Sequence, residues 1–301
     1  MRGVAYTFIA IILSSVVFVF ATTIDQPTRA TQSPISIVQS MNAVIDAFEE
    51  DLERGVYISS YRTVIGQIEK ITQTGEYLVD LNASYHEGML NRTIEGVNVS
   101  ALNGSGLIDW LDRTRTIYAN RGYHFEYEII SLEQYHTTPY AITNAATLTY
   151  NLSDPRQERR YERDIRVEVD IPVGGLEDPA YYMASIGRIS NIVEFTNETD
   201  IPTLINWSMM NSKYRSSNKS PSFLMRLEGN FSASEHGIES IVSGQRFLVQ
   251  GVGTYDGRSS IDALYFSTIA HEAQCMSGTP DWFRLDTDRL DDYTGSTNVT
   301  C

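Results

Sequence analysis

The spacing of apolar residues along the chain predicts helices first and strands afterwards. Between residues 35 and 81 the apolar positions recur at intervals of three and four, which is the period of one buried helix face. We therefore expect an amphipathic helix or a helical pair here, with Gly55 as the join or weak point. Its apolar face would consist of Ile37, Met41, Val44, Phe48, Leu52, Tyr61, Val64, Ile68 and Ile71.

The next segment, residues 82–106, is rich in glycine and in Asn-X-Ser/Thr motifs. This composition predicts a glycosylated loop. A short helix carrying Leu107, Leu111 and Tyr118 should follow, with Ser105 as its cap.

From residue 123 the period drops to two, which indicates strands with one buried and one solvated face. Phe125, Tyr127 and Ile129 form the first alternation, and the second covers residues 165–171. Four further strands are expected at residues 146–152, 223–231, 247–252 and 261–267.

The order of these elements predicts an α+β chain: an N-terminal membrane helix, a helical stalk or hairpin, then an antiparallel β-rich domain that is either a sheet or a sandwich. The expected boundaries are a membrane helix or leader at 1–21, a linker at 22–34, a helical region at 35–122 and a β-rich extracellular domain at 123–301.

An uncharged apolar segment of 18 residues runs from Val4 to Ala21, just long enough to span a bilayer as a helix. Arg2 precedes it and Asp25 follows it, so the charge bias places the short N-terminus inside and the body outside. The linker that follows contains Pro27 and Pro34, which break a helix.

The mature N-terminus has three alternatives. A signal peptidase cut after Ala21 would release a soluble protein that begins at Thr22. Alternatively, Arg2-Gly3-Val4-Ala5 resembles the leader of archaeal type IV pilin-like proteins, which implies a cut between Gly3 and Val4 and a retained helix. The segment could also stay uncut as a plain anchor.

Acceptor motifs for N-glycosylation are strongly over-represented. Ten of the 15 asparagines are followed two residues later by Ser or Thr, whereas the composition predicts about three by chance. Such acceptors function only in an external or lumenal compartment. The predicted acceptors are Asn82, Asn91, Asn98, Asn103, Asn151, Asn197, Asn206, Asn218, Asn230 and Asn298.

The chain has two cysteines, Cys275 and Cys301. In an oxidising compartment an even pair predicts a disulfide, and unpaired thiols are the alternative. The bridge would enclose 25 residues, and closing a loop of that size stabilises a fold by about 3 to 4 kcal/mol.

Composition excludes some functions and leaves others without support. A net charge of −15 argues against nucleic acid as a partner, because phosphate binding requires clustered basic side chains. No catalytic signature is present, and no cofactor is predicted. The acidic run Asp286, Asp288, Asp291 and Asp292 offers oxygen atoms for Ca²⁺ but lacks the Gly and distal Glu of an EF-hand loop, so we predict no metal site.

Several phrases in the second half of the chain resemble those of uncharacterised archaeal surface proteins with a single N-terminal membrane helix, which are type IV pilin-like at the N-terminus. The resemblance covers residues 2–21 and 172–293. The phrases are Gly175-Leu176-Glu177-Asp178-Pro179, Ser220-Pro221-Ser222-Phe223-Leu224, Arg226-Leu227-Glu228-Gly229, Gly237-Ile238-Glu239-Ser240, Ser259-Ser260-Ile261-Asp262 and Pro280-Asp281-Trp282-Phe283.

These observations predict a non-enzymatic, N-glycosylated, single-pass protein of the cell surface that acts as a minor pilin-like or cell-envelope component. The membrane, through the N-terminal helix, and pilus or envelope proteins would be its partners. Pro27 and Pro34 argue against a major filament subunit, because pilins usually continue their apolar helix directly into the stalk. The alternatives are an extracellular binding module, such as an adhesin or solute sensor, and a secreted hydrolase.

Overall fold

The computed structural model describes residues 34–154, 159–255, 257–267 and 272–293, with only the backbone of residues 34–40. The chain divides into two compact units, residues 1–47 and residues 48–301. The described part of the first unit is the beginning of one long helix. The second unit is an α+β fold with antiparallel sheets, as predicted.

The predicted membrane helix at residues 4–21 lies outside the described residues. Within the part of the chain that the structure describes, no helix combines the length and the apolar character that crossing a membrane requires. The membrane span therefore stays a prediction.

Helix α2 (Pro34–Thr74) is continuous, so the alternative of a single helix is confirmed and the alternative of a helical pair joined at Gly55 was wrong. Glycine is needed there for packing, because a Cβ atom at Gly55 would lie 2.7 Å from the indole of Trp110. Tyr61 also departs from the predicted apolar face: it is 40% exposed and stacks on Tyr57. The buried face of α2 in the second unit includes Phe48, Leu52, Val56, Ser59, Ser60, Thr63, Val64, Gln67, Ile68 and Ile71.

The prediction of a loop over residues 82–106 was wrong. This segment holds helix α3 (Leu81–Asn91), a small hairpin of β1 (Thr93–Ile94) and β2 (Val97–Asn98), and the 3-10 helix η1 (Ser100–Leu102). Asp80 caps α3 by accepting a hydrogen bond from the backbone N–H of Ala83 at 2.9 Å. Tertiary packing stabilises the helix, because it buries Leu81, Ser84, Tyr85, Gly88 and Met89.

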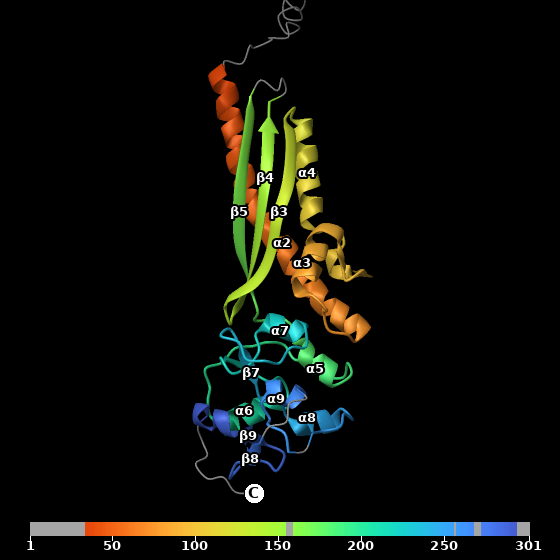
Figure 1. Ribbon diagram of the computed structural model, residues 1–301, viewed down its shortest axis with the longest axis vertical. Coiled ribbons are helices and arrows are strands. Elements are labelled where there is room, and N and C mark those ends of the chain that lie inside the picture. The colour runs from red at the N-terminus through yellow and green to blue at the C-terminus, as the bar shows by residue number, and fades with distance from the viewer. Residues whose placement is uncertain (1–33, 155–158, 256, 268–271, 294–301) are drawn as a thin grey trace, which may run out of the picture. The chain divides into compact units, whose positions relative to one another are not determined.

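Helix α4 (Leu107–Asn120) forms as predicted, but its N-cap residue is Gly106 and not Ser105. The Ser105 hydroxyl instead donates a hydrogen bond to the Ala101 carbonyl oxygen at 3.1 Å. Figure 1 shows α4 beside the first strand of the main sheet.

The main sheet consists of β3 (His124–Thr138), β4 (Ala141–Ser153) and β5 (Arg160–Pro172), paired antiparallel in that order. The predicted alternation is confirmed on one face, where Phe125 pairs with Leu152. That face packs against α2, and the Phe48 ring centroid lies 4.9 Å from that of Phe125 and 4.7 Å from that of Tyr150. The other face carries charged side chains.

The predicted β-rich character ends with β5. The rest of the described chain forms short helices and strands: α5 (Pro179–Ala184), α6 (Ile201–Ser208), β6 (Tyr214–Ser216), α7 (Phe223–Leu227), β7 (Ile238–Ser240), α8 (Gly244–Val249), α9 (Asp262–Phe266), β8 (Ala273–Cys275), β9 (Arg284–Asp286) and the 3-10 helix η2 (Thr287–Asp292). The short strands pair as β6-β7 and β8-β9.

Three strand predictions were therefore wrong, because α7 and α9 lie within residues 223–231 and 261–267, and α8 overlaps residues 247–252. A short apolar run fits a buried helical turn as well as a buried strand. Two of these helices are begun by local capping: the hydroxyls of Ser222 and Ser243 accept hydrogen bonds from the N–H groups of Met225 and Arg246.

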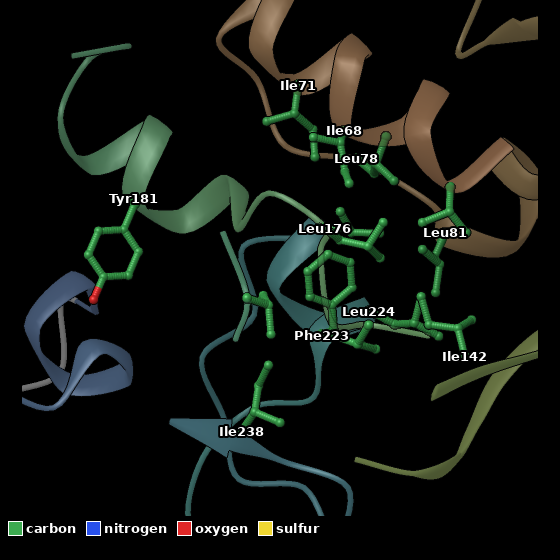
Figure 2. Packing of buried hydrophobic residues seen from close by; sticks show 14 of the residues in the cluster. Ile68, Ile71, Leu78, Leu81, Ile142, Leu176, Tyr181, Phe223, Leu224 and Ile238 are labelled. Atoms are coloured by element: carbon green, nitrogen blue, oxygen red, sulfur yellow. The ribbon is translucent and has the colours of Figure 1, made fainter. Parts of the chain in front are cut away.

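Two apolar clusters among the described residues add to the packing of α2 against the main sheet. The larger joins the end of α2 and the strands to α5, α7 and β7, and Figure 2 shows part of it, including Ile68, Ile142, Tyr181, Phe223 and Ile238. The smaller is built from Ile201, Leu204, Ile241, Ile261, Met276, Phe283, Leu285 and Tyr293. The short elements after β5 therefore have a core of their own, into which polar groups are also built.

Candidate functional site

A buried ionic cluster joins three of the phrases that the sequence singled out. It consists of Asp178, Arg226 and Asp262, whose side chains are each 0% exposed. The Arg226 Nη1 atom lies 2.8 Å from Asp178 Oδ2 and 3.0 Å from Asp262 Oδ2. Residues separated by 84 positions in the sequence thus share one cation.

Local structure positions each member of the ionic cluster. Asp178 precedes a proline, is extended as expected, and caps α5 through a hydrogen bond from the Ala180 N–H to Oδ1 at 2.9 Å. Arg226 lies in α7, the helix that Ser222 caps. Asp262 begins α9.

Neighbouring hydroxyl groups complete the hydrogen bonding of the carboxylates. Tyr214 donates to Asp178 Oδ2 at 2.8 Å, and Ser240 donates to Asp262 Oδ2 at 2.6 Å. The Arg226 guanidinium also donates to the Ile238 carbonyl oxygen at 2.5 Å. Its Nε atom has no hydrogen-bond partner among the described residues. A buried polar network of this kind is stable only while its members stay paired.

The charges of the ionic cluster are unequal in number, with two acids and one base. Burial raises the pKa of Asp262, although the Arg226 guanidinium opposes this shift. Burial disfavours the charge on Arg226, but Asp262 and Asp178 outweigh that effect and raise the Arg226 pKa. Arg226 therefore stays charged, and burial makes Asp262 take up a proton more readily than an exposed aspartate does.

Converging carboxylates are also a feature of hydrolases, but these two are sealed from solvent. A substrate cannot reach a carboxylate whose side chain is 0% exposed without prior opening of the fold. In the closed structure the ionic cluster links α5, α7 and α9, so the interaction that it provides is a structural one between these helices.

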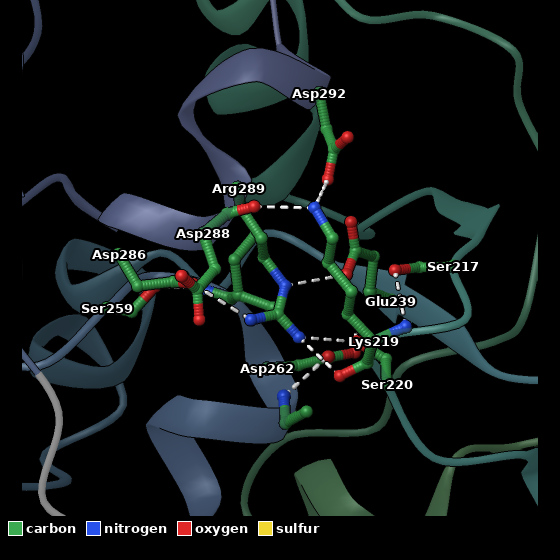
Figure 3. A network of polar contacts seen from close by, with 12 residues as sticks. Ser217, Lys219, Ser220, Glu239, Ser259, Asp262, Asp286, Asp288, Arg289 and Asp292 are labelled. Atoms are coloured by element: carbon green, nitrogen blue, oxygen red, sulfur yellow. Dashed lines mark hydrogen bonds and ion pairs between the residues drawn. The ribbon is translucent and has the colours of Figure 1, made fainter. Parts of the chain in front are cut away.

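A second buried network surrounds Arg289 of η2 and is shown in Figure 3. Its guanidinium contacts Glu239 Oε2 at 3.0 Å through Nε and Asp286 Oδ2 at 2.9 Å through Nη1. The Ser220 hydroxyl donates to Glu239 Oε2 at 2.8 Å, and Tyr293 donates to Glu239 Oε1 at 2.9 Å. The fully buried Glu239 is thereby shared between β7, η2 and the segment before α7.

The structure gives partners to two of the aspartates considered for Ca²⁺. Asp286 pairs with Arg289, and the Asp292 carboxylate lies 2.7 Å from Lys219 Nζ. Asp288 and Asp291 are exposed. Among the residues with described coordinates, no three His, Cys, Asp or Glu side chains come together as a metal-binding group.

The acceptor asparagines lie at the surface of the second unit. Eight of the nine that fall within the described residues are exposed, and Asn151, on the central strand β4, is half-buried. The exposed ones come from helices, the short strand β2, turns and loops: Asn82, Asn91, Asn98, Asn103, Asn197, Asn206, Asn218 and Asn230.

Some predicted positions lie outside the described residues. These are the leader residues Gly3 and Val4, the acceptor Asn298, and Cys301. Cys275 ends β8, but its predicted partner is among these residues, so the Cys275–Cys301 bridge stays a prediction.

Comparison of the chain with models of protein families, with curated proteins and with solved structures finds no match. The residues themselves are therefore the basis for inferring the function.

Proposed function

We propose that this chain is an N-glycosylated extracytoplasmic surface protein with a structural role, as a minor pilin-like or cell-envelope component. The observation that carries the proposal is the exposure of eight acceptor asparagines on the folded second unit. Acceptor motifs occur about three times more often than chance predicts, and exposure leaves room at the surface for the bulky glycans that they would carry.

The buried networks support the structural part of the proposal. Asp178, Arg226 and Asp262 lie in the interior and are occupied with one another. Buried ionic groups add little net stability compared with apolar residues of similar size, but in some proteins they select one arrangement of the chain. A rigid module with a polar, glycosylated exterior suits an envelope component.

Mass spectrometry of the native protein tests the proposal. We expect glycan masses on most peptides that contain an acceptor asparagine. Asn120 is exposed but lies outside any acceptor motif, so it is a matched control that should stay unmodified in the same digest. Unmodified asparagines at nearly all ten motifs would overturn the proposal.

A second candidate, an extracellular binding module, has one observation in its favour. A hollow of about 410 Å³ lies at the end of the main sheet, lined in part by Arg115, Glu126, Asn151 and Arg160. The Asn151 Oδ1 atom is buried and has no hydrogen-bond partner among the described residues. A small polar ligand such as a sugar could supply one. A rise in melting temperature with a panel of sugars that is lost in Asn151→Ala would support this candidate, and no rise with any of them would count against it.

A further inference from the structure

The acceptor motif has two functional groups, the asparagine carboxamide and the Ser or Thr hydroxyl, and in several motifs the fold exposes the first and buries the second. The glycan is attached to the asparagine, but the motif also requires the hydroxyl two residues later, so the transferase must contact both groups. Exposure of the asparagine alone is therefore insufficient for modification of the folded chain.

In helices the two groups point in different directions. Residues i and i+2 do not face each other on a helix, because each residue turns the chain by about 100°. In α3 the exposed Asn82 is followed by Ser84, which is 0% exposed. The Ser84 hydroxyl donates to the Leu81 carbonyl oxygen at 2.8 Å and accepts from Gln67 Nε2 at 3.0 Å.

Helix α6 repeats this arrangement. Asn206 is exposed, whereas Ser208 is 0% exposed and donates to the Ile205 carbonyl oxygen at 2.7 Å. The amphipathic pattern that folds each helix thus turns the asparagine outward and its partner hydroxyl inward.

In the loop motif at Asn218 the hydroxyl is inaccessible for a different reason. Asn218 is exposed, but Ser220 is 0% exposed and belongs to the Arg289 network. Its hydroxyl donates to Glu239 Oε2 at 2.8 Å and accepts from Arg289 Nη2 at 3.0 Å. Binding this hydroxyl to an enzyme would require opening of that buried network.

Asn230 has the opposite geometry. It lies in the turn after α7, where both Asn230 and Ser232 are exposed. The Asn230 Oδ1 atom accepts hydrogen bonds from the Ser232 N–H at 3.1 Å and from the Ser232 hydroxyl at 2.7 Å. Both groups of the motif are therefore on the same exposed side of the chain.

We infer that Asn82, Asn206 and Asn218 accept a glycan only before the chain folds, whereas Asn230 stays a substrate on the folded surface. This inference rests on the proposed function. In the transfer, the C1–O bond of a lipid-linked glycosyl phosphate breaks and a C1–N bond to the carboxamide forms. The phosphate leaves with the electron pair, and the amide proton passes to a base.

The consequence is an order of events outside the cytoplasm. If glycans occupy Asn82, Asn206 and Asn218, transfer at those positions precedes folding. The buried hydroxyls of Ser84, Ser208 and Ser220 then have two successive roles, first as recognition groups for the transferase and later as hydrogen-bonding groups of the core.

A transfer assay with two forms of the same acceptors tests the inference. The full chain is produced without glycans, and its folded state is checked by circular dichroism. It is then incubated with an Asn-X-Ser/Thr transferase and a lipid-linked glycosyl donor. In parallel, synthetic peptides centred on Asn82, Asn206, Asn218 and Asn230 serve as unfolded acceptors, and mass spectrometry gives the rate at each position.

We expect all four peptides to be modified, and we expect the folded chain to be modified at Asn230. At the other three positions the folded chain should be modified at least about tenfold more slowly than the matching peptide, because each of these positions needs local opening of the fold. Asn230→Gln, which keeps the turn exposed, should remove the rapid modification at that position only, because Asn98 and Ser100 are both exposed as well. Transfer to folded Asn82, Asn206 and Asn218 as rapid as to their peptides would overturn the inference.

The two proposals fail in different ways. Absence of glycans from the native protein would overturn the proposed function. The ratio of folded-chain to peptide rates would overturn the order of modification even if the native protein is glycosylated.

Discussion

Replacing Arg226 with Met removes the only cation within the ionic cluster. Asp178 and Asp262 would then remain 0% exposed without their partner at 2.8 and 3.0 Å. Breaking a buried ion pair by deleting one partner costs about 3 to 5 kcal/mol, because the remaining charge is buried and uncompensated. Loss of the Arg226 guanidinium also removes the interaction that opposes the raised pKa of Asp262, so Asp262 should take up a proton more readily in the variant.

Equilibrium unfolding of the full chain in urea measures this loss. Trp207 and Trp282 pack against the smaller apolar cluster and report its opening by fluorescence. With a denaturant slope of about 2 kcal/mol per molar urea, the midpoint should fall by about 2 M. Far-UV circular dichroism should give the same midpoint if unfolding is two-state.

Two further variants separate charge from packing. The triple variant Arg226→Met, Asp178→Asn, Asp262→Asn should recover more than half of the lost stability, because no unpaired charge remains buried. Arg166 is the matched control: it also contacts two carboxylates, those of Glu133 and Glu168, but is 42% exposed. Arg166→Met should hardly move the midpoint, and an equal shift in Arg226→Met and Arg166→Met would refute the reasoning.

Two other predictions concern packing and pH. Gly237→Ala should destabilise the chain by about 3 kcal/mol, the upper end of the usual cost of overpacking, because a Cβ atom would lie 1.9 Å from the Ser220 carbonyl oxygen. Gly253→Ala, whose Cβ atom would meet no atom within 4 Å, is the control in the same urea titration. Burial lowers the pKa of His136 from its ordinary value of 6.5, so the unfolded chain binds more protons and stability should fall as the pH drops below about 6.5. That acid sensitivity should weaken in His136→Gln but not in the exposed His86→Gln, and equal pH profiles of the thermal midpoint for the natural chain and His136→Gln would contradict it.

The pH prediction has a geometric basis. His136 Nε2 accepts a hydrogen bond from the Leu224 N–H at 3.3 Å, and Nδ1 donates to the Ala141 carbonyl oxygen at 2.8 Å. Protonation of Nε2 removes the acceptor and places a charge near His236, which also opposes it. The lowered carboxyl pKa values of Glu69 and Glu95 act near and below pH 4.5, so their effects fall in a more acidic range.

The local pattern of apolar and polar residues was sufficient to predict an element where one of its faces is buried and the other is exposed to solvent. Alternating residues predicted β3 and β5, and the spacing of three and four predicted α2. The exposure of most acceptor asparagines also followed, because these residues occur mainly at polar surface positions. Each of these features depends on neighbours close in the sequence.

Elements decided by distant contacts could not be predicted in this way. The Glu49 carboxylate lies 2.7 Å from Arg163, which is 114 residues away, and no local pattern indicates this contact. The apolar runs of α7, α8 and α9 resemble strands, and only the surrounding core makes them helical turns. Tertiary packing also turned the predicted loop at residues 82–91 into α3.

By itself, the sequence determined the α+β class, the main sheet and the surface acceptors, because these depend on periodicity and short motifs. Only the tertiary structure brought Asp178, Arg226 and Asp262 together and buried the hydroxyls of Ser84 and Ser220. The reason is physical: a motif specifies which groups are present, whereas burial and hydrogen bonding between distant segments decide which of them remain accessible.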